Sequence, residues 1–111
     1  AGAEETRLPL SITAHDNTYT FKEFTVAKDD KGNTTIAFRG YGFTVLPFRN
    51  GKMIVAVWCS FTSGGKEYEW EQVQTGKEGI TFTFDTSKTP ETIKLYAEDA
   101  RDKKYTLKAG K

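Results

Sequence analysis

Apolar and polar residues alternate along much of this chain. In 80–85 apolar residues alternate with threonine and aspartate, and in 93–98 with lysine, tyrosine and glutamate. In 67–71 glutamates alternate with Tyr68 and Trp70. Successive side chains of a strand point to opposite faces, so this pattern predicts strands with one face in a core and the other in water.

The segment 52–62 differs because neither of its faces is polar throughout. One face carries Met53, Val55, Val57, Cys59 and Phe61, and the other carries Ile54, Ala56, Trp58 and Ser60. A strand that is apolar on both faces belongs inside a sheet, where neighbouring elements cover at least part of each face. The segment is therefore predicted to be a central strand.

Residues that favour tight turns separate these segments. Asn50-Gly51 and Gly64-Gly65 each supply two positions that tolerate a positive φ, which favours a two-residue hairpin turn. The polar clusters 29–33 and 100–103 predict two further turns. Because no long stretch carries the i, i+3, i+4, i+7 apolar stripe of a helix, the chain is predicted to be all-β. We expect an antiparallel β-sandwich of about eight or nine strands.

Two parts of the chain change face partway along. Ile36 and Phe38 have one parity, whereas the large apolar residues of 41–45 have the other, with Gly40 between them. A bulge at Arg39-Gly40 returns both sets to the core, because one extra residue re-registers the pleat. A similar break is predicted near Glu23. The alternative at both places is a pair of separate short strands.

Length and charge indicate a single domain without a nucleic-acid partner. The chain has 111 residues, and we place one domain at 8–108 after a disordered N-terminal segment at 1–7. Its 16 basic and 15 acidic side chains leave a net charge of +1, which gives no electrostatic reason to expect nucleic acid. No apolar run approaches the roughly 20 residues of a spanning helix, so no transmembrane segment is predicted. We expect a monomer.

Few residues are suited to catalysis or metal binding. Cys59 is the lone cysteine, which excludes an internal disulfide and a cysteine-based zinc site; its alternation with Val57 and Phe61 predicts a core position. His15 is the lone histidine, and its polar neighbours indicate a solvated turn. The polar cluster 29–33 lacks the carboxylate spacing of a helix-loop-helix calcium site. We therefore predict no catalytic residue, no metal site and no cofactor.

Three residues form the predicted ligand-binding patch. By parity, Trp58 and Tyr96 lie on the face opposite the core, and so does Arg39. Exposed aromatic rings beside a cation are suited to holding sugar rings or peptide side chains, because rings offer a large contact area at low entropy cost. The alternative is that Trp58 belongs to a second packed face. A further alternative places a carbohydrate-binding surface on the strand of Tyr68 and Trp70.

The succession of short strands resembles a known kind of domain. An inner strand at 51–57 is followed by strands at 81–85 and 93–96, the last closing through 104–107. This order is similar to that of the small immunoglobulin-like sandwiches of secreted bacterial lipoproteins and surface proteins. The chain departs from antibody-type domains because it lacks their paired cysteines.

The resemblance implies a non-enzymatic, extracellular binding or interaction module with a protein or glycan partner at a cell surface. The alternative function is a carbohydrate-binding module that uses exposed aromatic residues. The polar sequence Ala1 to Glu5 reads as the start of a mature region left after export, or as the end of an artificially trimmed sequence. With the first of these origins, we expect a secreted or cell-surface protein.

Overall fold

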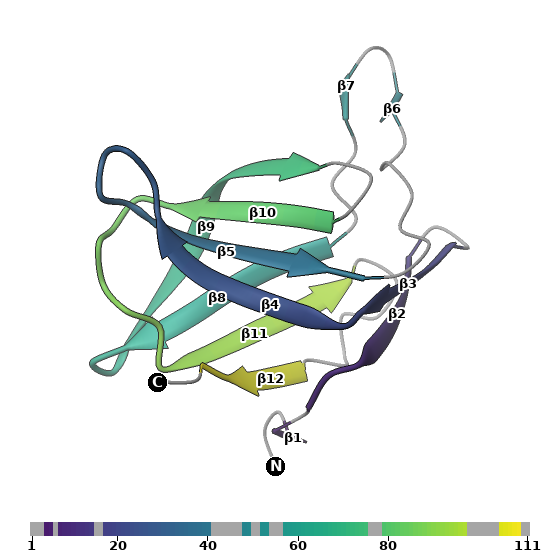
Figure 1. Ribbon diagram of the computed structural model, residues 1–111, viewed down its shortest axis with the longest axis horizontal. Coiled ribbons are helices and arrows are strands. Elements are labelled where there is room, and N and C mark those ends of the chain that lie inside the picture. The colour runs from purple at the N-terminus through teal and green to yellow at the C-terminus, as the bar shows by residue number, and fades with distance from the viewer. Residues whose placement is uncertain are drawn as a thin grey trace.

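A computed structural model of the chain describes residues 4–5, 7–14, 17–40, 48–49, 52–53, 57–75, 79–97 and 105–109. Within these ranges every regular element is a β-strand (Figure 1). The strands are β1 (Glu4–Glu5), β2 (Leu10–Ala14), β3 (Asn17–Phe21), β4 (Glu23–Lys28), β5 (Thr34–Arg39) and β6 (Phe48–Arg49). They continue with β7 (Lys52–Met53), β8 (Val57–Ser63), β9 (Lys66–Thr75), β10 (Gly79–Phe84), β11 (Thr92–Ala97) and β12 (Tyr105–Lys108). The all-β prediction is confirmed.

One large sheet dominates the fold. It has eight strands in the order β1-β12-β11-β8-β9-β10-β5-β4, and its pairs are antiparallel except for β1 with β12. The β2–β3 hairpin contacts β11 through β2 and β5 through β3. β8 is a central strand because β11 and β9 flank it, which confirms the prediction for the second part of 52–62. The start of that segment is different, since Lys52 and Met53 form β7, which pairs with β6 in a separate two-stranded sheet. Among the described residues no helix has the length and apolarity that crossing a membrane requires.

The sheet curls because β9 belongs to both of its halves. The first part of β9 pairs with β8, up to Glu69 opposite Ser60, and the remainder pairs with β10. The β9–β10 register shifts between Gln72 and Trp70, so Glu71 is an extra residue on one strand. Such a bulge bends a strand and increases its twist. The two halves of the sheet therefore enclose one core.

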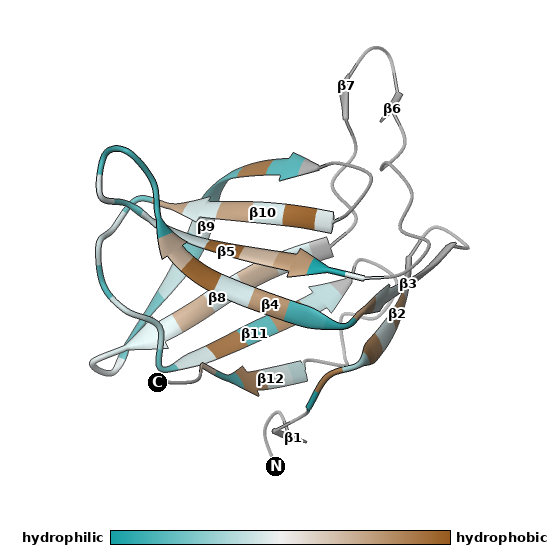
Figure 2. Cartoon of the chain, viewed as in Figure 1, coloured by the Kyte–Doolittle hydropathy of each residue, from teal (hydrophilic) through white to brown (hydrophobic). Residues whose placement is uncertain are grey.

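The core is built from the apolar sets that the alternation predicts. Its most buried side chains are Phe21, Phe38, Phe61, Phe82, Phe84, Ile12, Ile36, Ile80, Ile93 and Leu95. Figure 2 shows hydrophobic bands alternating with paler, less hydrophobic ones along β10. Edge contacts between rings join the halves of the sheet, since the Phe61 centroid of β8 lies 4.7 Å from that of Phe84 on β10. Cys59, with 1% of its surface exposed, is part of this core as predicted.

Two of the four predicted turns are seen directly. Gly64 and Gly65 have φ values of 61° and 81° and join β8 to β9 with Ser63 opposite Lys66. In 29–33 the Asp29 carboxylate accepts hydrogen bonds from the backbone N–H groups of Lys31 and Asn33, at 2.9 and 2.8 Å. This side-chain capping is the reason that aspartate favours such turns.

The other two predicted turns lie outside the described residues, but their flanking strands are placed. Arg49 of β6 lies opposite Lys52 of β7, which leaves the two residues Asn50-Gly51 between them, as a hairpin requires. β11 and β12 are antiparallel neighbours on either side of 98–104.

The break near Glu23 is a strand boundary. Phe21 ends β3, which pairs with β2, whereas Phe24 belongs to β4, which pairs with β5. The alternative of separate short strands is therefore correct here. Such boundaries also raise the strand total above the eight or nine expected, because the described residues alone hold twelve.

Only the first part of the bulge predicted at Arg39-Gly40 falls within the described residues, because 41–47 lie outside them. β5 ends at Arg39, and a Cβ atom on Gly40 would overlap the backbone carbonyl oxygen of Thr20. Close approach of two backbones is a second reason, besides a bulge, for glycine at a strand end. Gly79 is in the same situation against the carbonyl oxygen of Phe38.

The N-terminal segment 1–7, for which composition predicts disorder, contributes one short strand. Glu4 and Glu5 form β1 and lie opposite Tyr105 and Thr106 of β12. This pairing uses backbone hydrogen bonds, which any sequence can form and which a hydropathy pattern does not reveal.

Candidate functional site

The outward surface of β8 and β11 brings together two of the predicted site residues. Tyr96 on β11 lies opposite Trp58 on β8 in the antiparallel register. The alternation that buries Cys59 and Leu95 turns both rings to the other face of the sheet. The ring centroids are 5.7 Å apart and the ring planes are inclined by 32°. Both residues keep part of their surface exposed, so Trp58 is not enclosed in a second core.

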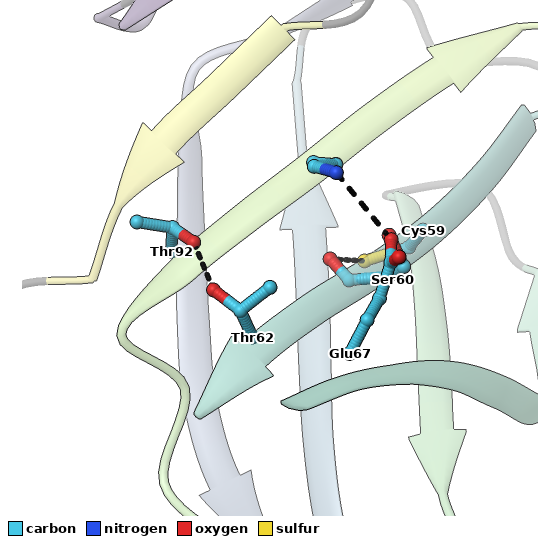
Figure 3. A network of polar contacts seen from close by, with 6 residues as sticks. Cys59, Ser60, Thr62, Glu67 and Thr92 are labelled. Atoms are coloured by element: carbon cyan, nitrogen blue, oxygen red, sulfur yellow. Dashed lines mark hydrogen bonds and ion pairs between the residues drawn. The ribbon is translucent and has the colours of Figure 1, made fainter. Parts of the chain in front are cut away.

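A polar network lies on the same face, two residues along each strand from the aromatic pair. Figure 3 shows the side chains of this network. The Ser60 hydroxyl donates a hydrogen bond of 3.0 Å to Oε2 of Glu67 on β9. Lys94 of β11 places its Nζ 3.5 Å from the same oxygen. Glu67 therefore joins three strands, and its carboxylate is held by both a hydroxyl and an ammonium group.

Two threonines extend this network toward the ends of β8 and β11. Their registers place Thr62 opposite Thr92, and the two hydroxyl groups form a hydrogen bond. Thr62 is also opposite Glu67 across the β8–β9 hairpin. We call the surface made by Trp58, Tyr96, Ser60, Lys94, Glu67, Thr62 and Thr92 the outer face.

Strand geometry orders the outer face into rows. Trp58 and Tyr96 form one row, and Ser60 with Lys94 forms the next. Neighbouring rows lie about 7 Å apart, because a strand rises ~3.4 Å per residue and every second side chain shares a face. The face thus presents an apolar row beside rows of hydrogen-bonding and charged groups.

Arg39, the third predicted site residue, lies in another part of the sheet. It is the last residue of β5, opposite Glu23 on β4 and Gly79 on β10. Its side chain is exposed, as the parity predicts. β9 and β10 separate β5 from β8 in the strand order, so the structure does not place Arg39 in the row of Trp58 and Tyr96.

Tyr68 and Trp70 of β9, offered by the sequence as an alternative sugar surface, face inward and pack against the core. The Tyr68 ring stacks on Phe61 with centroids 5.1 Å apart, and the Lys66 ammonium group lies over its ring at 5.2 Å. Trp70 lies 6.2 Å from Phe82. These contacts make the two rings part of the core packing, which favours the outer face as the aromatic surface.

A pocket lies where the middle of β9 and the end of β10 meet the turn at 29–33. Its volume is about 380 Å³, and it is lined by Asp29, Asp30, Lys31, Asn33, Glu71, Gln72, Thr83, Phe84 and Asp85. The Asp29 carboxylate is already engaged by the turn that it caps. No group of three or more His, Cys, Asp or Glu residues within the described ranges is arranged to hold a metal ion.

Among the described residues, the cysteine and the serine near the outer face supply no catalytic group to the site. Burial raises the pKa of the Cys59 thiol well above its ordinary value, which keeps it protonated. His15 lies outside the described residues. The Ser60 hydroxyl is only 2% exposed and its proton is directed at Glu67, so it serves to hold that carboxylate.

Sequence reasoning found the aromatic pair but missed the polar network beside it. The signal was present, because Ser60 and Lys94 share the parity of Trp58 and Tyr96. No family model, no curated protein and no solved structure matches this chain. The outer face itself offers ring surface, a hydrogen-bond donor and acceptors, which are the groups needed for reversible binding.

Proposed function

We propose that this protein is a non-catalytic binding module and that the outer face is its ligand surface. The observation that carries the proposal is the partly exposed Trp58–Tyr96 pair beside the Ser60–Glu67–Lys94 network. Aromatic residues at the centre of a patch contribute contact area at little entropic cost, and neighbouring polar groups fix the orientation of the ligand. A sheet is a rigid support for such a surface.

The network supports this proposal because it holds the polar groups in place before a ligand arrives. Glu67 is fixed by Ser60 and Lys94, and Thr62 by Thr92. Side chains that are already ordered lose little conformational entropy on binding. The partner we propose is a protein or a glycan at a cell surface, with the domain acting outside the cell.

The finer description of the fold belongs to the same proposal. An immunoglobulin-like sandwich is supported by the two halves of the sheet that enclose the core. Its particular feature is β9, which pairs with β8 and with β10 and so links the halves through one bent strand. Function is assigned from the site, since a fold of this kind can serve many purposes.

A carbohydrate-binding module is the second candidate. It is favoured by the presence of two neighbouring, partly exposed aromatic rings, whose centroids are 5.7 Å apart. Sugar rings present apolar C–H faces to aromatic side chains, while their hydroxyl groups reach adjacent donors and acceptors.

The test is retardation of the native protein in gels that contain soluble polysaccharides, or gelatin as an extracellular protein probe. We expect at least one probe to retard the protein, and Trp58→Ala and Tyr96→Ala to remove the retardation. Thr25→Ala, at an exposed position on the edge strand β4, is the matched control. Retardation that both ring variants retain would exclude the outer face as the ligand surface.

A further inference from the structure

We infer that the ligand of the outer face is an uncharged oligosaccharide that covers the aromatic row and the neighbouring polar row. This inference rests on the proposed binding function and names the class of ligand. It follows from the balance of charge on the face, from the pairing of donors with acceptors and from the spacing of the rows.

Among the described residues, charge is balanced on the outer face and at the outward positions beside it. Lys94 and Lys108 point outward from β11 and β12, and Glu67 and Glu69 point outward from β9. The positive and negative groups are also close together, since Lys94 Nζ lies 3.5 Å from Glu67. An anion near Lys94 therefore meets Glu67 at nearly the same distance, and a cation near Glu67 meets Lys94. A charged ligand gains little net attraction here.

An uncharged polyol can use both members of the ion pair. A sugar hydroxyl group donates one hydrogen bond and accepts others. It can therefore accept from the Lys94 ammonium group and donate to the Glu67 carboxylate without separating them. Lys94 and Glu67 keep 31% and 47% of their side-chain surface exposed, so both remain within reach of a ligand. Hydrogen bonds to charged groups are stronger than those between neutral groups.

The spacing of the rows sets a minimum length for the ligand. The polar row of Ser60 and Lys94 lies about 7 Å from the row of Trp58 and Tyr96, two residues along each strand. A monosaccharide seated on the ring pair covers only the aromatic row. A ligand that also engages Lys94 and Glu67 must have a second sugar unit.

The experiment compares neutral with anionic polysaccharides by affinity electrophoresis and calorimetry. The neutral probes are dextran, galactomannan, xyloglucan and arabinoxylan, with their oligosaccharides, and the anionic probes are polygalacturonate and hyaluronan. We expect at least one neutral probe to bind, with a dissociation constant that changes less than about twofold between about 0.05 M and 0.5 M salt. The disaccharide should bind at least about tenfold more tightly than its monosaccharide.

Substitutions distinguish the contribution of the aromatic row to binding from that of the polar row. Tyr96→Ala should weaken binding of the neutral probe at least about tenfold, and Lys94→Met and Glu67→Gln about three- to tenfold each. Thr25→Ala should leave it unchanged. Circular dichroism spectra identical to that of the unaltered protein show that each variant is folded, and Tyr96→Phe, which keeps the ring, should retain most of the affinity.

The possible failures are distinguishable. Binding of an anionic probe alone, a strong salt dependence, or no binding by any neutral probe overturns the inference. If an anionic polysaccharide or gelatin binds instead, and Tyr96→Ala abolishes that binding, the outer face stands as the ligand surface and only the ligand class is wrong. A neutral probe that binds equally well to Tyr96→Ala overturns the proposed surface itself.

Discussion

Tyr96 and Trp58 are direct cross-strand partners on the outward surface of the central strands, with ring centroids 5.7 Å apart. Cβ atoms of opposite residues in an antiparallel pair are close enough for aromatic side chains to interact. The pair therefore contributes to the stability of the β8–β11 ladder as well as forming part of the ligand surface that we propose.

The contribution to stability is measurable by a double-mutant cycle. Trp58→Ala, Tyr96→Ala and the double variant should reveal a coupling free energy of about 0.5–1.5 kcal/mol in urea unfolding, as for other aromatic pairs. A parallel cycle between Trp58→Ala and Thr25→Ala should give a coupling near zero, because β4 is far from β8 in the strand order. Equal coupling in the two cycles would contradict a specific interaction between the rings.

Gly79 should not tolerate even the smallest side chain. A Cβ atom there overlaps the carbonyl oxygen of Phe38, and both belong to paired backbones that have little freedom to move. We expect Gly79→Ala to lower the free energy of unfolding by about 2 kcal/mol or more. Gly65→Asn is the control, since Gly65 has a φ of 81° with open space around it and asparagine accepts such a turn position. A similar loss in both variants would contradict the close-approach explanation.

Phe82 contacts two other aromatic rings of the core. It is fully buried and its ring centroid lies 6.2 Å from those of both Phe38 and Trp70. Phe82→Ala should reduce the free energy of unfolding by about 3–5 kcal/mol, as large-to-small changes in cores do. Thr81→Ala, next to it on the opposite face of β10, should cost less than about 1 kcal/mol. The comparison is made by denaturant unfolding monitored by circular dichroism.

Cys59 makes stability depend on pH at the alkaline end. Burial raises the pKa of the folded thiol well above its ordinary value of 9.0, whereas the unfolded thiol keeps that ordinary value. Below pH 9.0 both states hold the proton. Above it the unfolded state loses its proton first, so the free energy of unfolding should fall as pH rises, with a slope approaching about 1.4 kcal/mol per pH unit.

The control for this titration is Cys59→Ala, which lacks the thiol. The difference in unfolding free energy between the unaltered protein and the variant should be constant up to about pH 8 and shrink above it. In the folded protein at neutral pH, the thiol should also react with Ellman's reagent only at the rate of unfolding. Rapid labelling under native conditions would contradict the burial of Cys59.

Alternation predicted which side of each strand faces the core. Phe82, Phe61 and Leu95 are buried, and their strand neighbours Thr81 and Tyr96 are not, because parity depends only on local backbone geometry. The Gly64-Gly65 turn was equally local, since its two positive φ values are a requirement of the two residues themselves.

The order of the strands in the sheet could not be predicted from local sequence patterns. Parity gave Arg39 the correct orientation, but its neighbours on β4 and β10 come from pairings between residues up to 40 positions apart in sequence. For the same reason the sequence did not unite Lys94 with Glu67, which requires β11 and β9 to flank β8. The sequence also left open whether Trp58 or the strand of Tyr68 and Trp70 supplies the exposed aromatic surface. That choice depends on which face of each strand the curled sheet encloses.

The most direct test of the outer face as a ligand surface uses the protein's two tryptophans separately. Trp70→Phe leaves Trp58 as the only reporter, and Trp58→Phe leaves Trp70, which packs against Phe82. The measurement is the tryptophan emission spectrum during titration with the neutral oligosaccharides named above. Our account predicts a saturable shift in the protein that retains Trp58 and none in the protein that retains Trp70. A response from Trp70 alone, or no response from Trp58 to any of these oligosaccharides, would contradict it.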